Sequence, residues 1–366
     1  MNILYLSKLE GNMWAGPNIS VPNQIKAQCE FDNVFWYNMN NIKNSEWLEM
    51  GVVCHNVCDF PKKSLSSLPQ PFNNPDLVVF EEFYTFSFEK IVKEIQKRSI
   101  PYIIIPRSTM THKAQLHKPL KKKIGNLLFF KKMSRRASAI HFLTEQEYLD
   151  SGNSWNDCSF IIPNGIYPKE NVRLKRLTDT IHAVYIGRIE IYQKGLDLLI
   201  EAIHDLKDTL IENRFSLSIY GPDREGGVSA LQELITKYEL KDVVHIYGAV
   251  FKEEKEKILR DSDLFIMTSR FEGLSMGLLE ALSFGVPALV STGTNMTSKI
   301  IEYKAGFDAG NDVSSIKTAL LEFIKSKKNI TELSENAIAL SNNYSWHNIA
   351  IVSHEKYSTL VKENEK

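Results

Sequence analysis

Short hydrophobic runs alternate with longer stretches of helical spacing along the whole chain. A first series of β-branched and aromatic runs comprises Ile3–Leu6, Val34–Tyr37, Leu77–Phe80, Tyr102–Ile105 and Ile140–Leu143. A second series comprises Phe160–Ile162, Ala183–Ile186, Leu217–Tyr220, Val243–Tyr247, Leu264–Met267 and Ala288–Val290. Mostly apolar runs separated by helix-length segments are typical of strands that are buried on both faces of a parallel sheet. The pattern therefore predicts an α/β protein.

The two series break around Pro163-Asn164-Gly165, near the middle of the 366-residue chain. A chain of this length exceeds the size at which one hydrophobic core keeps growing. We therefore expect two doubly wound domains, residues 1–165 and residues 166–345, and a C-terminal helix over residues 346–366 that packs back on the first domain. Open parallel sheets bind ligands beyond the carboxyl ends of their strands, so the segments after the strands are the candidates for chemistry.

Composition narrows the class of protein. Hydrophobic residues make up 43% and charged residues 24% of the chain, as in soluble globular proteins. Lysines with arginines and aspartates with glutamates both number 44, which gives no global reason to expect a nucleic-acid partner. Four scattered cysteines do not make a disulfide framework. No signal peptide or 18-residue apolar run is visible, so we expect a cytoplasmic protein whose membrane contact, if it has one, is peripheral.

The segment after Ala183–Ile186 contains Gly187-Arg188 and, six residues further on, Lys194-Gly195. Apolar residues then fall at helical spacing (Leu196, Leu199, Ile200 and Ile203), so a helix begins near Lys194. Two cations beside the positive end of a helix form an anion site suited to a diphosphate. The alternative is that both are ordinary surface side chains in a loop.

The segment after Leu264–Met267 reads Glu272-Gly-Leu-Ser-Met-Gly-Leu-Leu-Glu280. Gly273 lets the backbone approach a ligand closely, and the free amides of Leu274, Ser275 and Met276 lie at the start of a helix. Glu280 lies one turn into this helix, where it can accept hydrogen bonds from a ribose, and Glu272 can point at a bound sugar. The alternative is a pair of helix-cap carboxylates.

This string resembles the E-x7-E motif of the family 4 retaining glycosyltransferases. The resemblance extends over roughly residues 160–350 through Ile162-Pro-Asn-Gly165, Gly187-Arg188, Lys194-Gly195, Gly285-Val-Pro287 and Tyr344-Ser-Trp346. It implies the GT-B fold, with two Rossmann-like domains that face each other across a cleft. It also implies a nucleotide-sugar co-substrate, expected to be a UDP-sugar, and retention at the anomeric carbon with no metal or other cofactor.

Carried over by position, the resemblance implies catalytic roles for Glu272, Arg188, Lys194 and Arg107. Arg188 and Lys194 hold the diphosphate, Glu280 binds the ribose, and Glu272 with the Leu274–Met276 amides holds the donor sugar and phosphate. Gly187 and Gly273 complete this site. In the first half, Gly16 stands where relatives carry a Gly-Gly loop, and Arg107 follows the strand after which relatives place a histidine. His112 is a lesser candidate for that role.

Asp261-Ser-Asp263 has the spacing of a metal-binding D-x-D motif, but it precedes a predicted strand instead of following one. We interpret it as the end of a helix and a turn.

Residues 100–144 contain no aspartate or glutamate but ten lysines and arginines, with apolar residues between them. Such a segment is typical of a helix that binds anionic lipid headgroups. We assign six lysines to a membrane or acceptor face: Lys118, Lys121, Lys122, Lys123, Lys131 and Lys132. The alternative is a solvated helix whose apolar side lies in the core.

Together these features predict a glycosyltransferase that moves a sugar from a nucleotide donor to a surface polysaccharide, such as lipopolysaccharide or capsule, or to a lipid-linked oligosaccharide. A polyprenyl-diphosphate-linked acceptor fits the basic segment. Two alternatives stay open, a GT-B-type nucleotide-sugar epimerase and a non-catalytic scaffold with a nucleotide-sugar site. A nicotinamide oxidoreductase is disfavoured, because no strand is followed by G-x-G-x-x-G.

Overall fold

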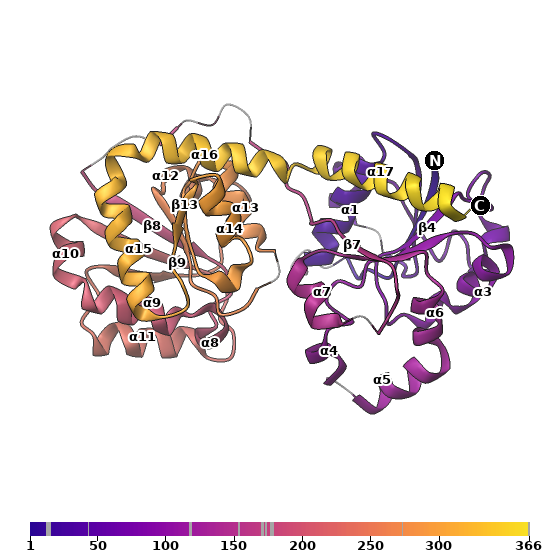
Figure 1. The fold of residues 1–366 in the computed structure, drawn as a ribbon, viewed down its shortest axis with the longest axis horizontal. Helices are drawn as coiled ribbons and strands as arrows, with labels where there is room; N and C mark the ends of the chain where they lie inside the picture. Colours follow the sequence, from indigo (N-terminus) through magenta and orange to yellow (C-terminus); the bar gives the residue numbers. More distant parts are fainter. Residues whose placement is uncertain are drawn as a thin grey trace. The chain divides into compact units, whose positions relative to one another are not determined.

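The computed structural model describes residues 1–11, 16–42, 44–116, 119–152, 154–169, 172, 174–175, 179–272 and 274–364. The chain divides into two compact units (Figure 1). Unit 1 comprises Met1–Gly165 together with Trp346–Lys366, and unit 2 comprises Ile166–Ser345.

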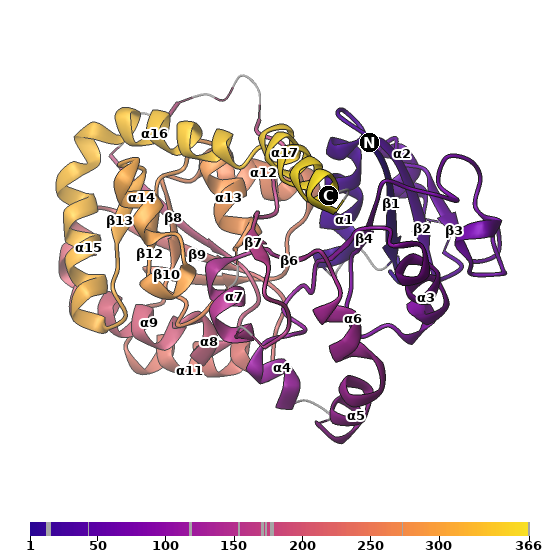
Figure 2. The same ribbon diagram turned by 45° about the vertical axis from the view of Figure 1, so that its right-hand side comes forward.

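Unit 1 is built on a parallel seven-stranded sheet of order β3-β2-β1-β4-β5-β6-β7 (Figure 2). Its strands are β1 (Asn2–Ser7), β2 (Asn33–Asn38), β3 (Cys54–Asn56), β4 (Leu77–Phe80), β5 (Tyr102–Ile104), β6 (Ala139–Phe142) and β7 (Ser159–Ile161). Its helices are α1 (Gly16–Gln28), α2 (Ser45–Glu49), η1 (Leu65–Ser67), η2 (Phe86–Phe88), α3 (Glu89–Arg98), α4 (His112–Leu116), α5 (Pro119–Gly125), the π-helix η3 (Asn126–Phe130), α6 (Lys131–Arg135), α7 (Glu145–Ser151) and α17 (Trp346–Asn364).

The two faces of this sheet carry separate cores. Side chains alternate along a strand, so Tyr5 of β1 packs in one cluster with Val21 of α1 and Tyr357 of α17. Its neighbour Leu4 packs in the other cluster with Ile91 of α3. The last helix of the chain, α17, therefore completes the core of unit 1.

Unit 2 is built on a parallel six-stranded sheet of order β10-β9-β8-β11-β12-β13. Its strands are β8 (Ile181–Ile186), β9 (Phe215–Tyr220), β10 (Val244–Tyr247), β11 (Leu264–Met267), β12 (Ala288–Val290) and β13 (Gly306–Asp308). Its helices are α8 (Ile191–Lys194), α9 (Leu196–Asp205), α10 (Lys207–Glu212), α11 (Gly227–Lys237), α12 (Lys252–Asp261), α13 (Met276–Ser283), η4 (Thr292–Thr294), α14 (Thr297–Glu302), α15 (Val313–Ser326), η5 (Lys327–Asn329) and α16 (Ile330–Asn343).

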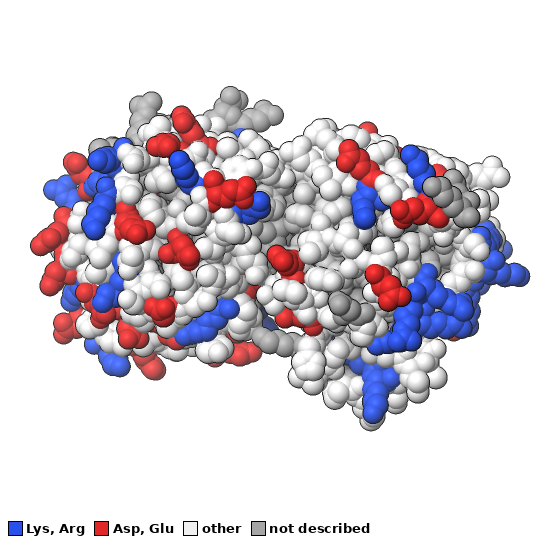
Figure 3. Space-filling model, viewed as in Figure 1, with Lys and Arg blue, Asp and Glu red and all other residues white. Residues whose placement is uncertain are grey.

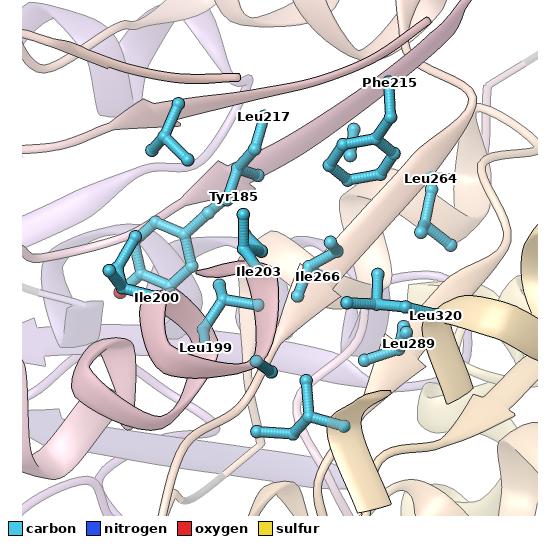
Figure 4. Packing of buried hydrophobic residues seen from close by; sticks show 14 of the residues in the cluster. Tyr185, Leu199, Ile200, Ile203, Phe215, Leu217, Leu264, Ile266, Leu289 and Leu320 are labelled. Atoms are coloured by element: carbon cyan, nitrogen blue, oxygen red, sulfur yellow. The ribbon is translucent and has the colours of Figure 1, made fainter. Parts of the chain in front are cut away.

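One core of unit 2 lies between its sheet and the helix that the sequence predicts after Lys194. That helix is α9, and its four periodic apolar residues are all buried. Leu199, Ile200 and Ile203 pack against side chains of the sheet in the cluster that Figure 4 shows. The prediction of this helix is confirmed.

All eleven predicted strands are present, and the prediction of doubly wound α/β domains is confirmed. One assignment is wrong: Phe160–Ile162, which the pattern groups with the second series, overlaps β7 and pairs with β6 in the sheet of unit 1. The strands β3 and β13 were not predicted, because each has three residues and includes polar or small side chains.

The topology places one switch point in each sheet. In unit 2 the chain runs from β8 to β9 and β10 on one side, then returns to β11, β12 and β13 on the other. The chain therefore leaves β8 and β11 towards opposite sides of the sheet, and doubly wound sheets bind ligands beyond the strand ends at such a switch point. Within the described part of the chain, none of the helices has the length and apolar composition needed to cross a bilayer.

Candidate functional site

The loop after β8 is in close contact with the loop after β9. The amide of Gly187 donates to the carbonyl of Tyr220 at 3.0 Å, and the Tyr185 hydroxyl donates to the carbonyl of Arg188 at 2.8 Å. A Cβ on Gly221 would lie 1.8 Å from the Gly187 carbonyl oxygen, so only glycine fits there. The Arg188 side chain is 49% exposed, and its nearest carboxylate is that of Glu190 at 4.0 Å. Its guanidinium is therefore available to an anionic ligand.

Lys194 lies at the end of α8, and its side chain is almost fully buried. Its ammonium group forms an ion pair with the carboxylate of Glu272, which follows β11. The two loops also meet elsewhere: the Thr268 hydroxyl donates to the carbonyls of Lys194 and Gly195 at 3.2 and 3.1 Å, and the amide of Arg270 donates to the carbonyl of Gln193 at 2.8 Å. The structure thus brings together two predicted site residues that lie 78 positions apart in the sequence.

Glu272 is held on several sides. Its Oε1 atom accepts a hydrogen bond from the Ser269 hydroxyl at 3.0 Å, and its carbonyl accepts one from Asn295 at 2.7 Å. Burial, reinforced by the charge of Glu272, raises the pKa of Tyr185 well above its usual range, so Tyr185 stays a neutral donor. The carboxylate therefore occupies a fixed position beside the only slightly exposed Lys194.

The predicted helix after Glu272 is α13, which begins at Met276. Ser275 is its N-cap, and the serine hydroxyl accepts a hydrogen bond from the amide of Leu278 at 3.3 Å. Leu274 precedes the cap, so the amides of the loop and the first turn lie at the positive end of the helix. Gly273 lies outside the described residues.

Glu280 lies in the second turn of α13, and its side chain is 37% exposed. Its carboxylate forms an ion pair with Lys255 of α12. Sequence reasoning missed Lys255, because it lies in a charged helical stretch that has no distinguishing motif. It also missed Arg270, which makes a bidentate ion pair with Asp197 at 2.7 and 2.8 Å and so joins the β11 loop to α9.

Arg107 of unit 1 follows β5, as predicted, but its guanidinium is already bound. It donates to the buried carboxylate of Glu81 at 2.6 Å, to the Ser20 hydroxyl at 3.0 Å and to Gln24 at 3.0 Å. Burial raises the pKa of Glu81, and the positive charge of Arg107 opposes that shift. The contacts tie the loops after β4 and β5 to α1. A role of Arg107 at the reacting sugar stays a prediction.

The other N-terminal candidates are exposed. Gly16 is the first residue of α1, and residues 12–15 lie outside the described part of the chain. A Cβ at Gly16 would meet nothing within 4 Å, so the position is open to solvent or to a ligand. His112 begins α4 and is also exposed.

The Asp261-Ser-Asp263 segment is the end of a helix, as predicted. Asp261 is the last residue of α12, and Asp263 accepts a hydrogen bond from the amide of His182 at 2.8 Å. Among the described residues, no three His, Cys, Asp or Glu side chains are placed so that they could share a metal ion.

The lysines of the basic segment differ in their exposure to solvent. Lys121, Lys123 and Lys132 are exposed, whereas Lys122 and Lys131 are partly buried and fold over the rings of Tyr84 and Trp155. Lys118 lies outside the described residues.

Comparison with known proteins shows a family to which this part of the chain is similar. Residues 168–340 match the sequence profile of the glycosyl transferases group 1. This part of the chain is similar to group 1 glycosyltransferases. The match spans most of unit 2 and includes every predicted site residue that follows β8 or β11.

Two curated relatives show how far this similarity reaches. The chain is 27% identical over 163 residues to a putative colanic acid biosynthesis glycosyltransferase of Salmonella typhimurium, covering 43% of this chain and 36% of the relative. It is 27% identical over 212 residues to one component of the human phosphatidylinositol N-acetylglucosaminyltransferase, covering 56% of this chain and 41% of that protein. The chain thus spans about two fifths of the length of these relatives.

Solved structures resemble the whole chain. An Anabaena protein, Alr3699/HepE, solved in complex with UDP, superimposes with a TM-score of 0.71 at 16% identity, over 98% of this chain and all of that one. Sucrose-phosphate synthase from Thermosynechococcus elongatus gives 0.69 at 18% identity, over 99% and 100% of the two chains. The prediction of a two-domain α/β protein of the GT-B type is confirmed.

Proposed function

We propose that this protein transfers a sugar from a nucleotide-sugar donor, and that the donor binds in unit 2 between the loops after β8 and β11. The observation that carries the proposal is the convergence of Lys194, Glu272 and the start of α13 at the switch point of the sheet. Lys194 provides a positive charge, the start of α13 provides amide donors, and Glu272 provides a fixed carboxylate. The group 1 match over residues 168–340 and the UDP complex of the Anabaena protein support this reading.

Each group has a task that its chemistry suits. Arg188, which is half-exposed, and Lys194 bind the diphosphate, and the amides of Leu274–Met276 bind its phosphate oxygens. Glu280 accepts hydrogen bonds from the ribose hydroxyls and exchanges its ion pair with Lys255 for them. Glu272 hydrogen-bonds the hydroxyls of the donor sugar through its Oε2 atom, since Ser269 and Lys194 both bind its Oε1 atom.

The reaction breaks the bond between the anomeric carbon and the diphosphate oxygen, so negative charge grows on the leaving group and positive charge on the sugar ring. Fixed cations and amide donors at the leaving group stabilise that charge in the transition state. We propose that Arg188 and Lys194 supply this stabilisation without a metal ion. We also propose front-face attack with retention, in which the leaving phosphate helps to deprotonate the acceptor hydroxyl.

The acceptor we propose is a growing surface polysaccharide or a lipid-linked oligosaccharide. The support is the similarity to the Salmonella relative, which is named as a putative colanic acid biosynthesis glycosyltransferase, together with the exposed lysines of unit 1. A UDP-sugar is the donor, as the complex of the Anabaena protein with UDP suggests.

Donor hydrolysis tests this function without knowledge of the acceptor. The protein is incubated with a panel of UDP-sugars, and released UDP is measured over hours. We expect slow release with at least one donor, and loss of that release in Lys194→Ala. A protein that binds UDP but releases none from any donor, with or without a glycan acceptor, is a scaffold, and that outcome refutes the proposal.

A further inference from the structure

Unit 1 exposes a group of large aliphatic side chains on α5 and η3. We call it the α5 surface and define it as Leu120, Ile124, Leu127 and Leu128, which are 71%, 51%, 85% and 71% exposed. Among the described residues, Leu120, Leu127 and Leu128 are the three most exposed large hydrophobic side chains. Single exposed apolar side chains are common, but a contiguous group marks an interaction site.

The core of unit 1 does not use these side chains, because other residues of the same segment face inward. Gly125 is buried, and a Cβ there would lie 3.2 Å from the ring of Phe130. Phe130 is 1% exposed and packs on Tyr84 and Phe86, with ring centroids 4.9 and 4.7 Å apart. The interpretation of this segment as a solvated helix with its apolar side in the core is therefore wrong for the four residues of the α5 surface.

The cations beside the α5 surface have no acidic partner in the described part of the chain. Lys121, Lys123, Lys132 and Arg135 are exposed, and none of them forms an ion pair with a described carboxylate. The stretch from residue 100 to residue 144 supplies no acidic side chain. Figure 3 shows Lys and Arg side chains gathered next to a projecting, mostly uncharged part of unit 1. The four positive charges thus lie on α5 or on α6, which follows η3 directly.

The segment is also placed where a flat surface could reach it. Figures 1 and 2 show α5 projecting away from the sheet of unit 1 in both views. A pocket of about 340 Å³ adjoins Leu128 and has an apolar lining of Val92, Phe129 and Met133, with Lys132 and the ion pair of Lys93 and Glu89 beside it. The apolar area therefore continues inward from the α5 surface between α3 and α6.

We propose that the α5 surface inserts into the headgroup region of an anionic lipid bilayer, while Lys121, Lys123, Lys132 and Arg135 bind lipid phosphates around it. Apolar side chains that enter the acyl boundary and cations that bind the headgroups are the two components of interfacial membrane binding. The inference deepens the proposed function by naming the partner of unit 1, but it rests on the contacts of unit 1 and not on the donor site.

Two other occupants fit the surface less well. A second copy of the chain would bring the same four cations against each other, and like charges at an interface oppose association. A single-stranded nucleic acid needs several aromatic rings on which successive bases stack, whereas the four residues of the α5 surface are aliphatic and one exposed ring, Phe86, adjoins them. An anionic bilayer provides negative headgroups for the cations and an apolar layer for the four aliphatic side chains.

Co-sedimentation with vesicles tests the proposal. We expect the protein to pellet with vesicles of phosphatidylglycerol and phosphatidylcholine, to stay in solution with phosphatidylcholine alone, and to be released by salt, which screens charges beyond about 8 Å at physiological ionic strength. Each basic residue near an anionic surface contributes about a fivefold gain in binding, so loss of three charges weakens binding about 100-fold and the charge-reversed K121E/K123E/K132E variant should lose at least that much. Leu127→Ser with Leu128→Ser should lower binding by at least about tenfold.

Matched controls carry the same changes elsewhere. The K257E/K325E/K328E variant makes the same change in net charge at exposed lysines of unit 2, and Leu48→Ser with Leu149→Ser removes two exposed leucines of unit 1. Both controls should bind vesicles like the wild type. Equal binding of either test variant and its control overturns the proposal, and so does equal binding to phosphatidylcholine alone. A lipid-free dimer that dissociates only in the leucine test variant overturns it in favour of self-association.

Folding and donor binding are followed in the same samples. All four variants should melt and bind UDP as the wild type does, because none of the changed residues lies in the core or in the donor site. If vesicle binding behaves as expected but the wild type binds no UDP, the proposed function fails and the inference about the α5 surface stands.

Discussion

Gly195 joins the two loops of the donor site, and we expect its replacement by alanine to damage unit 2 more than an equivalent change elsewhere. Gly195 has a φ of +61°, and a Cβ there would lie 2.0 Å from the carbonyl oxygen of Thr268. Gly226 is the matched control, with a φ of +79° and nothing within 4 Å of its Cβ position. Both changes force an L-residue into the left-handed region, and only one forces a collision.

The magnitudes follow from this difference. The left-handed conformation costs about 1–2 kcal/mol at either position. At Gly195 the Thr268 carbonyl must also move by more than about 1 Å, and overpacking of that kind costs about 1–3 kcal/mol. The displacement weakens the two hydrogen bonds from the Thr268 hydroxyl, which adds about 1 kcal/mol. We expect a loss of at least about 3 kcal/mol for Gly195→Ala and about 1–2 kcal/mol for Gly226→Ala.

Thermal melting followed by circular dichroism measures both variants. For a unit of this size, about 1 kcal/mol corresponds to about 2–4 °C in Tm. Gly195→Ala should therefore lower the Tm of unit 2 by at least about 6 °C, and Gly226→Ala by about 2–8 °C, with the larger loss always in Gly195→Ala. Gly195→Ala should also weaken UDP binding, because Lys194 moves with its neighbour. Equal melting temperatures for the two variants would refute the idea that the β8 and β11 loops are locked together at this point.

Three further predictions concern chemistry and pH. Arg188→Ala and Lys194→Ala should lower kcat more than donor affinity, because the negative charge that Arg188 and Lys194 stabilise grows in the transition state. A wild-type kcat in steady-state kinetics of either variant would contradict the proposed role of the residue that it lacks. EDTA should leave transfer intact, and a strict requirement for added Mn²⁺ or Mg²⁺ would contradict the metal-free mechanism. Burial lowers the pKa of His141 from 6.5 to about 4. The unfolded chain therefore takes up a proton that the folded one does not, so the stability of unit 1 should be complete above about pH 6.5 and fall by about 3 kcal/mol towards pH 4. Urea unfolding across this range should show the slope in the wild type and a flatter profile in His141→Gln.

Much of the fold could be predicted from the sequence, because strands buried on both faces are apolar throughout. The run Leu77–Phe80 is fully buried in β4, and the periodic residues after Lys194 form the buried side of α9. The strand Cys54–Asn56 could not be predicted, because β3 lies at the edge of the sheet and carries polar residues. The sheet to which Phe160 belongs depends on long-range pairing with β6, which its own residues do not encode.

The candidate site was predictable as a set of loops but not as a set of contacts. The sequence places Lys194 and Glu272 after two strands, yet it does not reveal that they pair, because the ion pair depends on the adjacency of β8 and β11. Arg107 shows the opposite case. Its position after a strand suggested a free cation, whereas the buried Glu81 that binds it lies on the loop of a neighbouring strand. Side-chain partners of this kind follow from the topology, which sequence motifs do not specify.

Calorimetry with UDP tests the central claim most directly, because the account places the nucleotide at the switch point of unit 2. Wild-type protein should bind one UDP, and Glu280→Ala should weaken binding by about 1.5–3 kcal/mol through loss of a charge-assisted hydrogen bond to the ribose. The exposed Glu322 of α15 is the control, and Glu322→Ala should bind UDP as the wild type does. Equal affinity of the Glu280 and Glu322 variants would contradict the assignment of the site. No binding of UDP or of any other nucleoside diphosphate by the wild type would contradict the donor site itself.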